Sequence, residues 1–92
     1  MIGFAENRRN ILQAELTRFL DELPPLGVHQ IFVIGDFVSL RVGIETALEL
    51  LIIQETSEPF HRRSDFFVDH LRPRVDTRFY VYTPDEFDRL KD

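Results

Sequence analysis

The chain alternates between segments whose hydrophobic spacing is helical and segments whose spacing is that of strands. Over residues 7–23 the apolar positions recur every three or four residues, which predicts an amphipathic helix with Leu12, Leu16, Phe19, Leu20 and Leu23 on its buried side. Pro24, Pro25 and Gly27 follow and end that helix. Residues 28–34 form a short β-branched apolar run, which is typical of a buried strand.

The middle of the chain predicts a second strand, a second helix and a third strand. Residues 47–53 are apolar apart from Glu49, so this strand is expected to be buried on both faces near the centre of a sheet. Residues 60–71 have Phe60, Phe67 and Leu71 on one helical stripe, and Pro73 stops the helix. Residues 75–82 alternate in character and predict a third strand. Between the first two strands, a short helical turn is expected from Asp36.

The last helix has a clear start signal. Thr83 is a good N-cap, Pro84 suits the first helical position, and Glu86 completes a capping box. The helix is expected to run to about residue 91 and to dock Phe87 and Leu90. The predicted order is α-β-β-α-β-α, an α/β (α+β) fold with a small mixed sheet of about three strands and helices packed on it. Residues 1–92 are expected to form a single domain.

Composition excludes several classes of protein. No apolar run approaches the roughly 18 residues that span a bilayer, and residues 1–6 lack the pattern of a signal peptide, so a cytoplasmic location without membrane contact is expected. The absence of Cys excludes disulfides and Cys-ligated zinc. The net charge of −5 argues against a nucleic acid partner. His29, His61 and His70 are too scattered in the sequence to predict a metal site.

Three segments resemble motifs of the small nucleotidyltransferases of the DNA polymerase beta superfamily. The apolar run that ends in Gly35-Asp36 is similar to the family's strand ending in Gly-Ser, and Ala47-Leu48-Glu49 stands where the family has Asp-x-Asp. Val75-Asp76, followed later by Thr83-Pro84-Asp85-Glu86-Phe87, looks like the family's valine-aspartate strand running into a Tyr-Thr-Pro-Glu-Glu-Phe helix start. The resemblance covers roughly residues 11–90 and implies the family's fold.

The resemblance implies metal-dependent nucleotidyl transfer, in which carboxylates hold Mg²⁺ against a triphosphate. Asp-x-Asp suits this task because residues two apart on a strand point to the same face. Ala47 has no ligand atom, Glu49 keeps a longer carboxylate, and Asp76 matches the family's third acid. An active enzyme would therefore use Glu49 and Asp76 as catalytic and metal-binding residues, with Asp36 or Glu45 completing the ligand set.

The phosphate-binding motif departs further from the family. Gly35 and Asp36 occupy its cofactor-binding positions, and Gly35 still allows close backbone approach. Asp36 replaces the serine and would repel a triphosphate, although as an N-cap it would stabilise the turn; the sequence leaves its direction open. The family's Ala-Arg-Gly is replaced by Val38, Ser39 and Leu40, and Arg41 is the nearest basic residue.

These departures favour a domain that keeps the fold, has lost catalysis and acts as a binding or regulatory module without a cofactor. The family's active members are commonly the antitoxin half of toxin–antitoxin pairs with an all-helical partner, so the resemblance implies a protein partner. Two alternatives remain: an active enzyme that uses Mg²⁺ and ATP through Glu49 and Asp76, and a self-associating structural domain. In an inactive domain, Glu49 is expected to form an ion pair with Arg78, which lies on the same face of its strand as Asp76.

Overall fold

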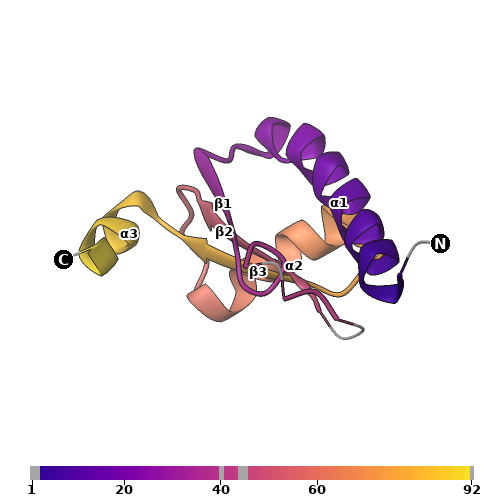
Figure 1. The fold of residues 1–92 in the computed structure, drawn as a ribbon. Helices are drawn as coiled ribbons and strands as arrows, with labels where there is room; N and C mark the ends of the chain where they lie inside the picture. The colour runs from indigo at the N-terminus through magenta and orange to yellow at the C-terminus, as the bar shows by residue number, and fades with distance from the viewer. Residues whose placement is uncertain (1–2, 40, 44–45, 92) are drawn as a thin grey trace.

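The computed structural model describes residues 3–39, 41–43 and 46–91 (Figure 1). Within them, three α-helices and a three-stranded mixed sheet form an α+β fold, as the hydrophobic pattern predicts. The elements in chain order are α1 (Phe4–Glu22), the 3₁₀ turn η1 (Pro24–Leu26), β1 (Gln30–Ile34), β2 (Leu48–Ile53), α2 (Phe60–Leu71), β3 (Thr77–Tyr82) and α3 (Pro84–Lys91). None of these helices is long and apolar enough to cross a membrane.

The sheet has the order β1-β2-β3, with β2 antiparallel to β1 and parallel to β3. The central place of β2 confirms the prediction from its nearly continuous apolar sequence. Parallel neighbours need a crossover connection, and α2 supplies it between β2 and β3.

One face of the sheet carries the hydrophobic core beneath α1 and α2. Phe79 of β3 contacts both helices, because its ring lies 5.9 Å from that of Phe19 and 5.8 Å from that of Phe67. Leu12, Leu16 and Leu23 of α1 belong to the same buried cluster. Burial of these side chains is the main term that holds the helices on the sheet.

A buried ion pair also ties α1 to the segment that leads into β3. The Glu15 carboxylate, 5% exposed, accepts hydrogen bonds from the Arg18 guanidinium and from the backbone N–H of Arg74. Arg18 in turn donates to the backbone carbonyl of Leu71 at the end of α2. The Arg18 hydrogen bonds outweigh the effect of burial and lower the pKa of Glu15.

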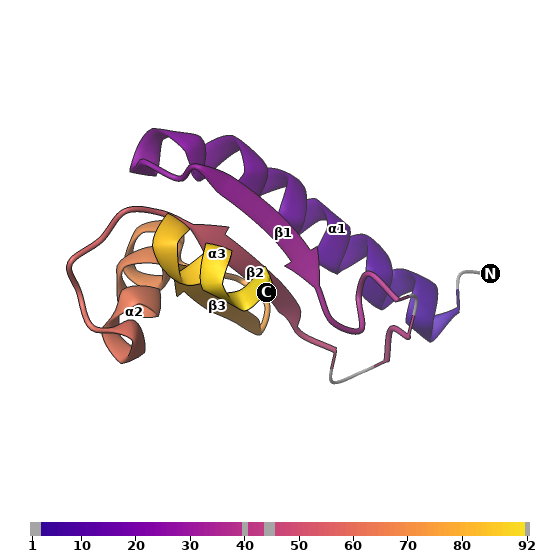
Figure 2. The same cartoon turned by 90° about the vertical axis from the view of Figure 1, so that its left-hand side faces the viewer.

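Some details of the sequence prediction are wrong. Both outer strands start two residues later than expected, at Gln30 and Thr77. Leu20, placed on the buried stripe of α1, is 44% exposed, and Phe60 of α2 is 48% exposed. Leu90, expected to dock α3, is 61% exposed. Helix α3 lies beyond the end of the sheet (Figure 1) and contacts the body through Phe87 and Glu86. Figure 2, seen from that end, shows α3 in front of β2 and β3.

The capping box at the start of α3 is confirmed. Thr83 Oγ1 accepts the Glu86 N–H at 3.2 Å, and Glu86 Oε1 accepts the Thr83 N–H at 2.8 Å. The same carboxylate binds the guanidinium of Arg63 on α2, which also donates to the Val81 carbonyl. The Arg63 hydrogen bonds, followed by that from the Thr83 backbone, lower the pKa of Glu86 to about 2.

Candidate functional site

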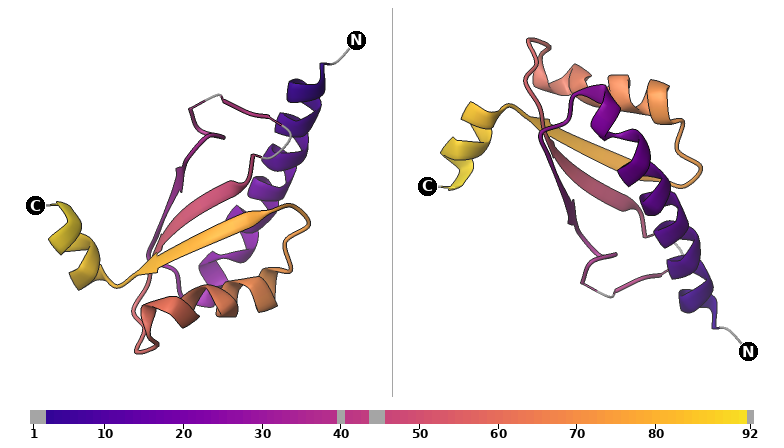
Figure 3. Two further views of the ribbon diagram at one scale, coloured as in Figure 1. Left: turned by 90° about the horizontal axis from the view of Figure 1, so that it is seen from below. Right: turned by 90° about the horizontal axis from the view of Figure 1, so that it is seen from above.

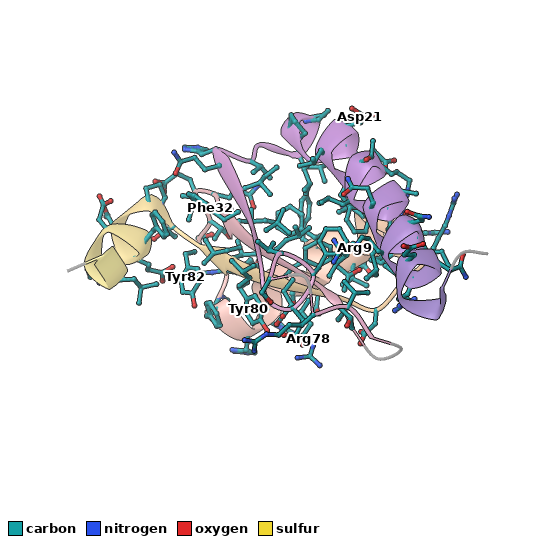
Figure 4. All side chains as sticks on the ribbon, in the orientation of Figure 1. Arg9, Asp21, Phe32, Arg78, Tyr80 and Tyr82 are labelled. Carbon is teal, nitrogen blue, oxygen red and sulfur yellow. The ribbon has the colours of Figure 1, made fainter. Side chains whose placement is uncertain are left out.

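The second face of the sheet is not covered by α1 or α2, and we call it the open face. The register arranges its side chains in three rows that cross the strands: Gln30, Ile53 and Tyr82; Phe32, Leu51 and Tyr80; and Ile34, Glu49 and Arg78. Figure 4 shows Arg78, Tyr80 and Tyr82 in succession along β3, with Tyr82 nearest α3. The charged row therefore lies at the end of the sheet away from α3.

A hollow of about 480 Å³ lies beside the charged row. Its lining residues come from the β1–β2 connection and from the starts of β2 and β3: Asp36, Arg41, Gly43, Thr46, Ala47, Glu49 and Arg78. The segments that the nucleotidyltransferase resemblance singles out, around Gly35 and around Glu49, thus meet at one place. We call this feature the hollow.

Gly35 is in direct contact with Glu49, which lines the hollow. Gly35 has a φ of +84°, which favours glycine, and a Cβ built there would lie 1.9 Å from Glu49 Oε2. The contact follows from the register, because Ile34, the residue before Gly35, pairs with Glu49. Glycine is therefore required at this position both by the backbone and by the carboxylate packed against it.

The predicted ion pair between Glu49 and Arg78 is wrong. The two residues are neighbours in the register, but their charged groups form no ion pair in the described structure. Instead, Glu49 Oε1 accepts a hydrogen bond of 3.1 Å from the Tyr80 hydroxyl. Tyr80 lies two residues along β3 on the same face, and its rigid ring delivers the hydroxyl to the carboxylate, while Arg78 is exposed.

Asp36 lines the hollow, which answers the question that the sequence left open. Its backbone carbonyl closes the turn by accepting from the Arg41 N–H at 3.0 Å, and no hydrogen bond of its carboxylate occurs among the described residues. Ser39 is exposed, and its hydroxyl donates within the turn, 3.3 Å from the Gly35 and Asp36 carbonyls. The helical turn predicted from Asp36 is thus present, with its acid directed at the hollow.

The outer wall of the hollow is attached to α1. Thr46 is buried, and its hydroxyl accepts the Gly43 N–H at 2.7 Å, which closes a small loop. Arg8 of α1 donates to the Thr46 carbonyl at 3.0 Å. The sequence pattern does not point to Thr46, whereas Arg41 is the basic residue nearest to the expected phosphate-binding motif. Leu40 and Glu45, which belong to the segments resembling the nucleotidyltransferase site, lie outside the described residues.

Asp76, the expected third acid, stands just before β3. Its carbonyl accepts the Leu48 N–H at 2.9 Å, and its place two residues before Arg78 puts it on the open face. Asp76 is not among the described residues that line the hollow. The geometry therefore brings together Gly35, Asp36 and Glu49, with Asp76 on the same face but outside the hollow.

The charged groups in and beside the hollow are mixed in sign. Asp36 and Glu49 are accompanied by the guanidinium groups of Arg41 and Arg78. Across the described residues, no group of three or more His, Cys, Asp or Glu side chains is placed to hold a metal ion. Ala47 adds no ligand atom, and one oxygen of Glu49 is already hydrogen-bonded to Tyr80. Mg²⁺ usually takes several carboxylate and phosphate oxygens, and the hollow presents two carboxylates beside two guanidinium groups.

No protein-family model, curated protein or solved structure matches this chain. The nucleotidyltransferase resemblance consequently stays a prediction from the motifs.

Proposed function

We propose that this chain is a nucleotidyltransferase-like domain that has lost nucleotidyl transfer and acts as a binding or regulatory module. The observation that carries the proposal is the composition of the hollow. It lies where the family's motif positions meet, and there it presents Ala47, a hydrogen-bonded Glu49 and two arginines.

Two electrostatic effects support the loss of metal binding. Ala47 stands where the family's Asp-x-Asp motif has its first aspartate, so the site has one negative charge fewer. Arg78, the register neighbour of Glu49 on β3, lines the same hollow and adds a positive charge to it. A divalent cation at Glu49 would be repelled by that guanidinium.

The proposed partner is a protein. By analogy with the family, it would be the all-helical component of a toxin–antitoxin pair, with this domain as the antitoxin-like half. The net charge of −5 suits a basic partner. A gene for a small helical protein next to the gene for this chain would support this role.

Titration with Mn²⁺, followed by electron paramagnetic resonance, tests the loss of metal binding. We expect the wild-type domain to bind Mn²⁺ at least about tenfold more weakly than the double variant Ala47→Asp with Arg78→Leu, which restores a carboxylate and removes the cation. Ala47→Asn with Arg78→Leu is the matched control without the charge. Equal Mn²⁺ affinity of the wild type and the double variant would contradict the proposal.

The alternative function is an active Mg²⁺-dependent nucleotidyltransferase. One observation favours it: Asp76 comes directly before β3, two residues ahead of Arg78, and Arg78 is the register neighbour of Glu49. This alternative requires that Glu49→Gln abolish metal-dependent nucleotide binding. If Glu49→Gln and the wild type bind Mg-ATP equally well, the alternative fails.

A further inference from the structure

Helix α3 adds little to the buried interior of the molecule. Every residue from Pro84 to Leu90 is partly or fully exposed, and the hydrophobic core includes no member of this helix. Figure 3 shows α3 projecting beyond the end of β3 in both views. Elements with few buried apolar contacts open locally at a lower free energy than the rest of a fold. Helix α3 is therefore well placed to move while the sheet stays intact.

The connection between β3 and α3 has the geometry of a hinge. Thr83 is the single residue between the two elements. Up to Tyr82 the chain is held in the sheet, because the Tyr82 carbonyl accepts the Gln54 N–H at 2.9 Å. Thr83 is instead fastened to the helix, through the two hydrogen bonds of its capping box with Glu86. Backbone rotation between Tyr82 and Thr83 can thus swing α3 without breaking a backbone hydrogen bond of either element.

An ion pair spans this hinge and holds α3 against the body. The Arg63 guanidinium donates to both carboxylate oxygens of Glu86, over 2.5 Å from Nη1 to Oε1 and 3.2 Å from Nη2 to Oε2. Arg63 is 9% exposed and also donates to the carbonyls of Glu58 and Val81, which fix it to the body. The Glu86 side chain is 36% exposed. The pair therefore joins a fixed, buried cation to an acid on the movable helix that water can reach.

In the observed position, α3 lies against aromatic side chains at the end of the sheet. Its Phe87 ring stacks on Phe32 of the open face at 5.5 Å. A cleft of about 280 Å³ separates α3 from the Phe60 and Tyr82 rings, which pack together at 5.2 Å. On the α3 side, the cleft is lined by Glu86, Arg89 and Leu90. The helix thus shields part of Phe32 and forms one wall of the cleft.

We infer that α3 is a hinged lid, which turns about Thr83 and is held closed by the latch between Arg63 and Glu86. Opening separates Phe87 from Phe32 and removes one wall of the cleft, so the Phe32, Phe60 and Tyr82 rings become more accessible. Closing restores the stacked rings and the ion pair. The lid lies at the end of the sheet opposite the hollow, so its test is independent of the proposed function.

A single tryptophan on the lid can report its position, because the chain has no tryptophan of its own. In the Phe87→Trp variant the indole is expected to stack on Phe32 and to be partly shielded from acrylamide. Urea unfolding is followed by this fluorescence and by far-ultraviolet circular dichroism, which reports mainly the longer helices α1 and α2. We expect the fluorescence midpoint at a lower urea concentration than the circular dichroism midpoint. Coincident midpoints would overturn the lid.

The latch is tested in the same reporter variant by Glu86→Gln. Glutamine keeps the capping box but removes the charge that binds Arg63. We expect the gap between the two midpoints to widen by at least about 0.5 M urea. Asp85→Asn is the matched control, because it removes another acid of the first turn that is exposed and forms no ion pair with the described side chains. An equal change of the gap in the two variants would show that Arg63 and Glu86 are not the latch.

Discussion

Gly35 shows how one residue connects the backbone, the sheet and the hollow. Its left-handed φ turns the chain out of β1, and its missing side chain leaves room for the Glu49 carboxylate. Glu49 is also held by the Tyr80 hydroxyl, so two contacts fix the acid in the lining of the hollow. The contact makes the glycine and the glutamate mutually dependent.

Substitution of Gly35 by alanine is expected to lower the free energy of unfolding by about 1–2 kcal/mol, which is the cost of a left-handed backbone for an L-residue. Displacement of the Glu49 side chain adds to that loss. Adding Glu49→Ala to Gly35→Ala is expected to remove the loss caused by displacement of the Glu49 side chain. The loss caused by the left-handed backbone is expected to remain. Urea unfolding of the two single variants and the double variant measures both parts; strict additivity would show that Gly35 and Glu49 do not interact.

The motif residues Gly35, Asp36 and Glu49 could be singled out from sequence because their types and spacing follow from strand geometry. The partner of Glu49 could not be predicted. Arg78 and Tyr80 lie on the same face of β3, and side-chain direction and reach decide between them. The sequence favoured an ion pair between Glu49 and Arg78, whereas in the folded chain Glu49 accepts a hydrogen bond from the Tyr80 hydroxyl.

Among the connections between elements, the Glu15–Arg18 pair is one that the sequence did not reveal. From the sequence, Glu15 is an ordinary acidic residue on a helix surface. In the folded chain it is buried, because the segment before β3 covers it. Its carboxylate accepts from Arg18 and from the Arg74 N–H, so its loss leaves two donors without their acceptor. The pair therefore stabilises the contact between α1 and the start of β3.

Replacement of Glu15 by glutamine is expected to lower the free energy of unfolding by about 1–3 kcal/mol, because charge-assisted hydrogen bonds in a buried site are lost. Glu22→Gln is the matched control: Glu22 pairs with the same Arg18 but is 48% exposed. Glu22→Gln is expected to lower the free energy of unfolding by less than about 1 kcal/mol. Equal losses in the two variants would contradict a special role for the buried acid.

The attachment of α3 depends on Glu86 and is sensitive to acid. The pKa of Glu86 is lowered to about 2 from 4.5, chiefly by the Arg63 hydrogen bonds. The folded state thus binds the proton less tightly than the unfolded chain does, so this stabilisation is complete above pH 4.5 and is lost as the pH falls toward 2. We expect Glu86→Gln to flatten the acid side of the stability profile in part, because the lowered pKa of Glu15 acts in the same direction.

Urea unfolding at several pH values between 2 and 7 measures the effect of Glu86→Gln. Arg63→Met is expected to flatten the same part of the profile, since it removes the partner of the carboxylate. An unchanged acid slope in both variants would show that the pair does not contribute to stability.

At the scale of the whole molecule, the α+β class and the element order could be predicted from hydrophobic periodicity alone. The central position of β2 also followed, because its nearly continuous apolar sequence suits burial on both faces. The projection of α3 could not be predicted: Phe87 and Leu90 have the spacing of a docked helix, yet the core beneath the sheet is already filled by α1 and α2. An amphipathic pattern shows that a surface is suited to burial, and does not identify what buries it.

We propose that the motif positions resembling a nucleotidyltransferase site meet in this fold without metal-dependent nucleotide binding. Calorimetric titration of the wild-type domain with ATP, in the presence and absence of Mg²⁺, tests this proposal. We expect no heat that depends on Mg²⁺, because Ala47 offers no ligand atom and Arg78 adds a positive charge to the hollow. Mg²⁺-dependent binding with a micromolar dissociation constant, about −8 kcal/mol, would contradict the account and identify Glu49 and Asp76 as working metal ligands.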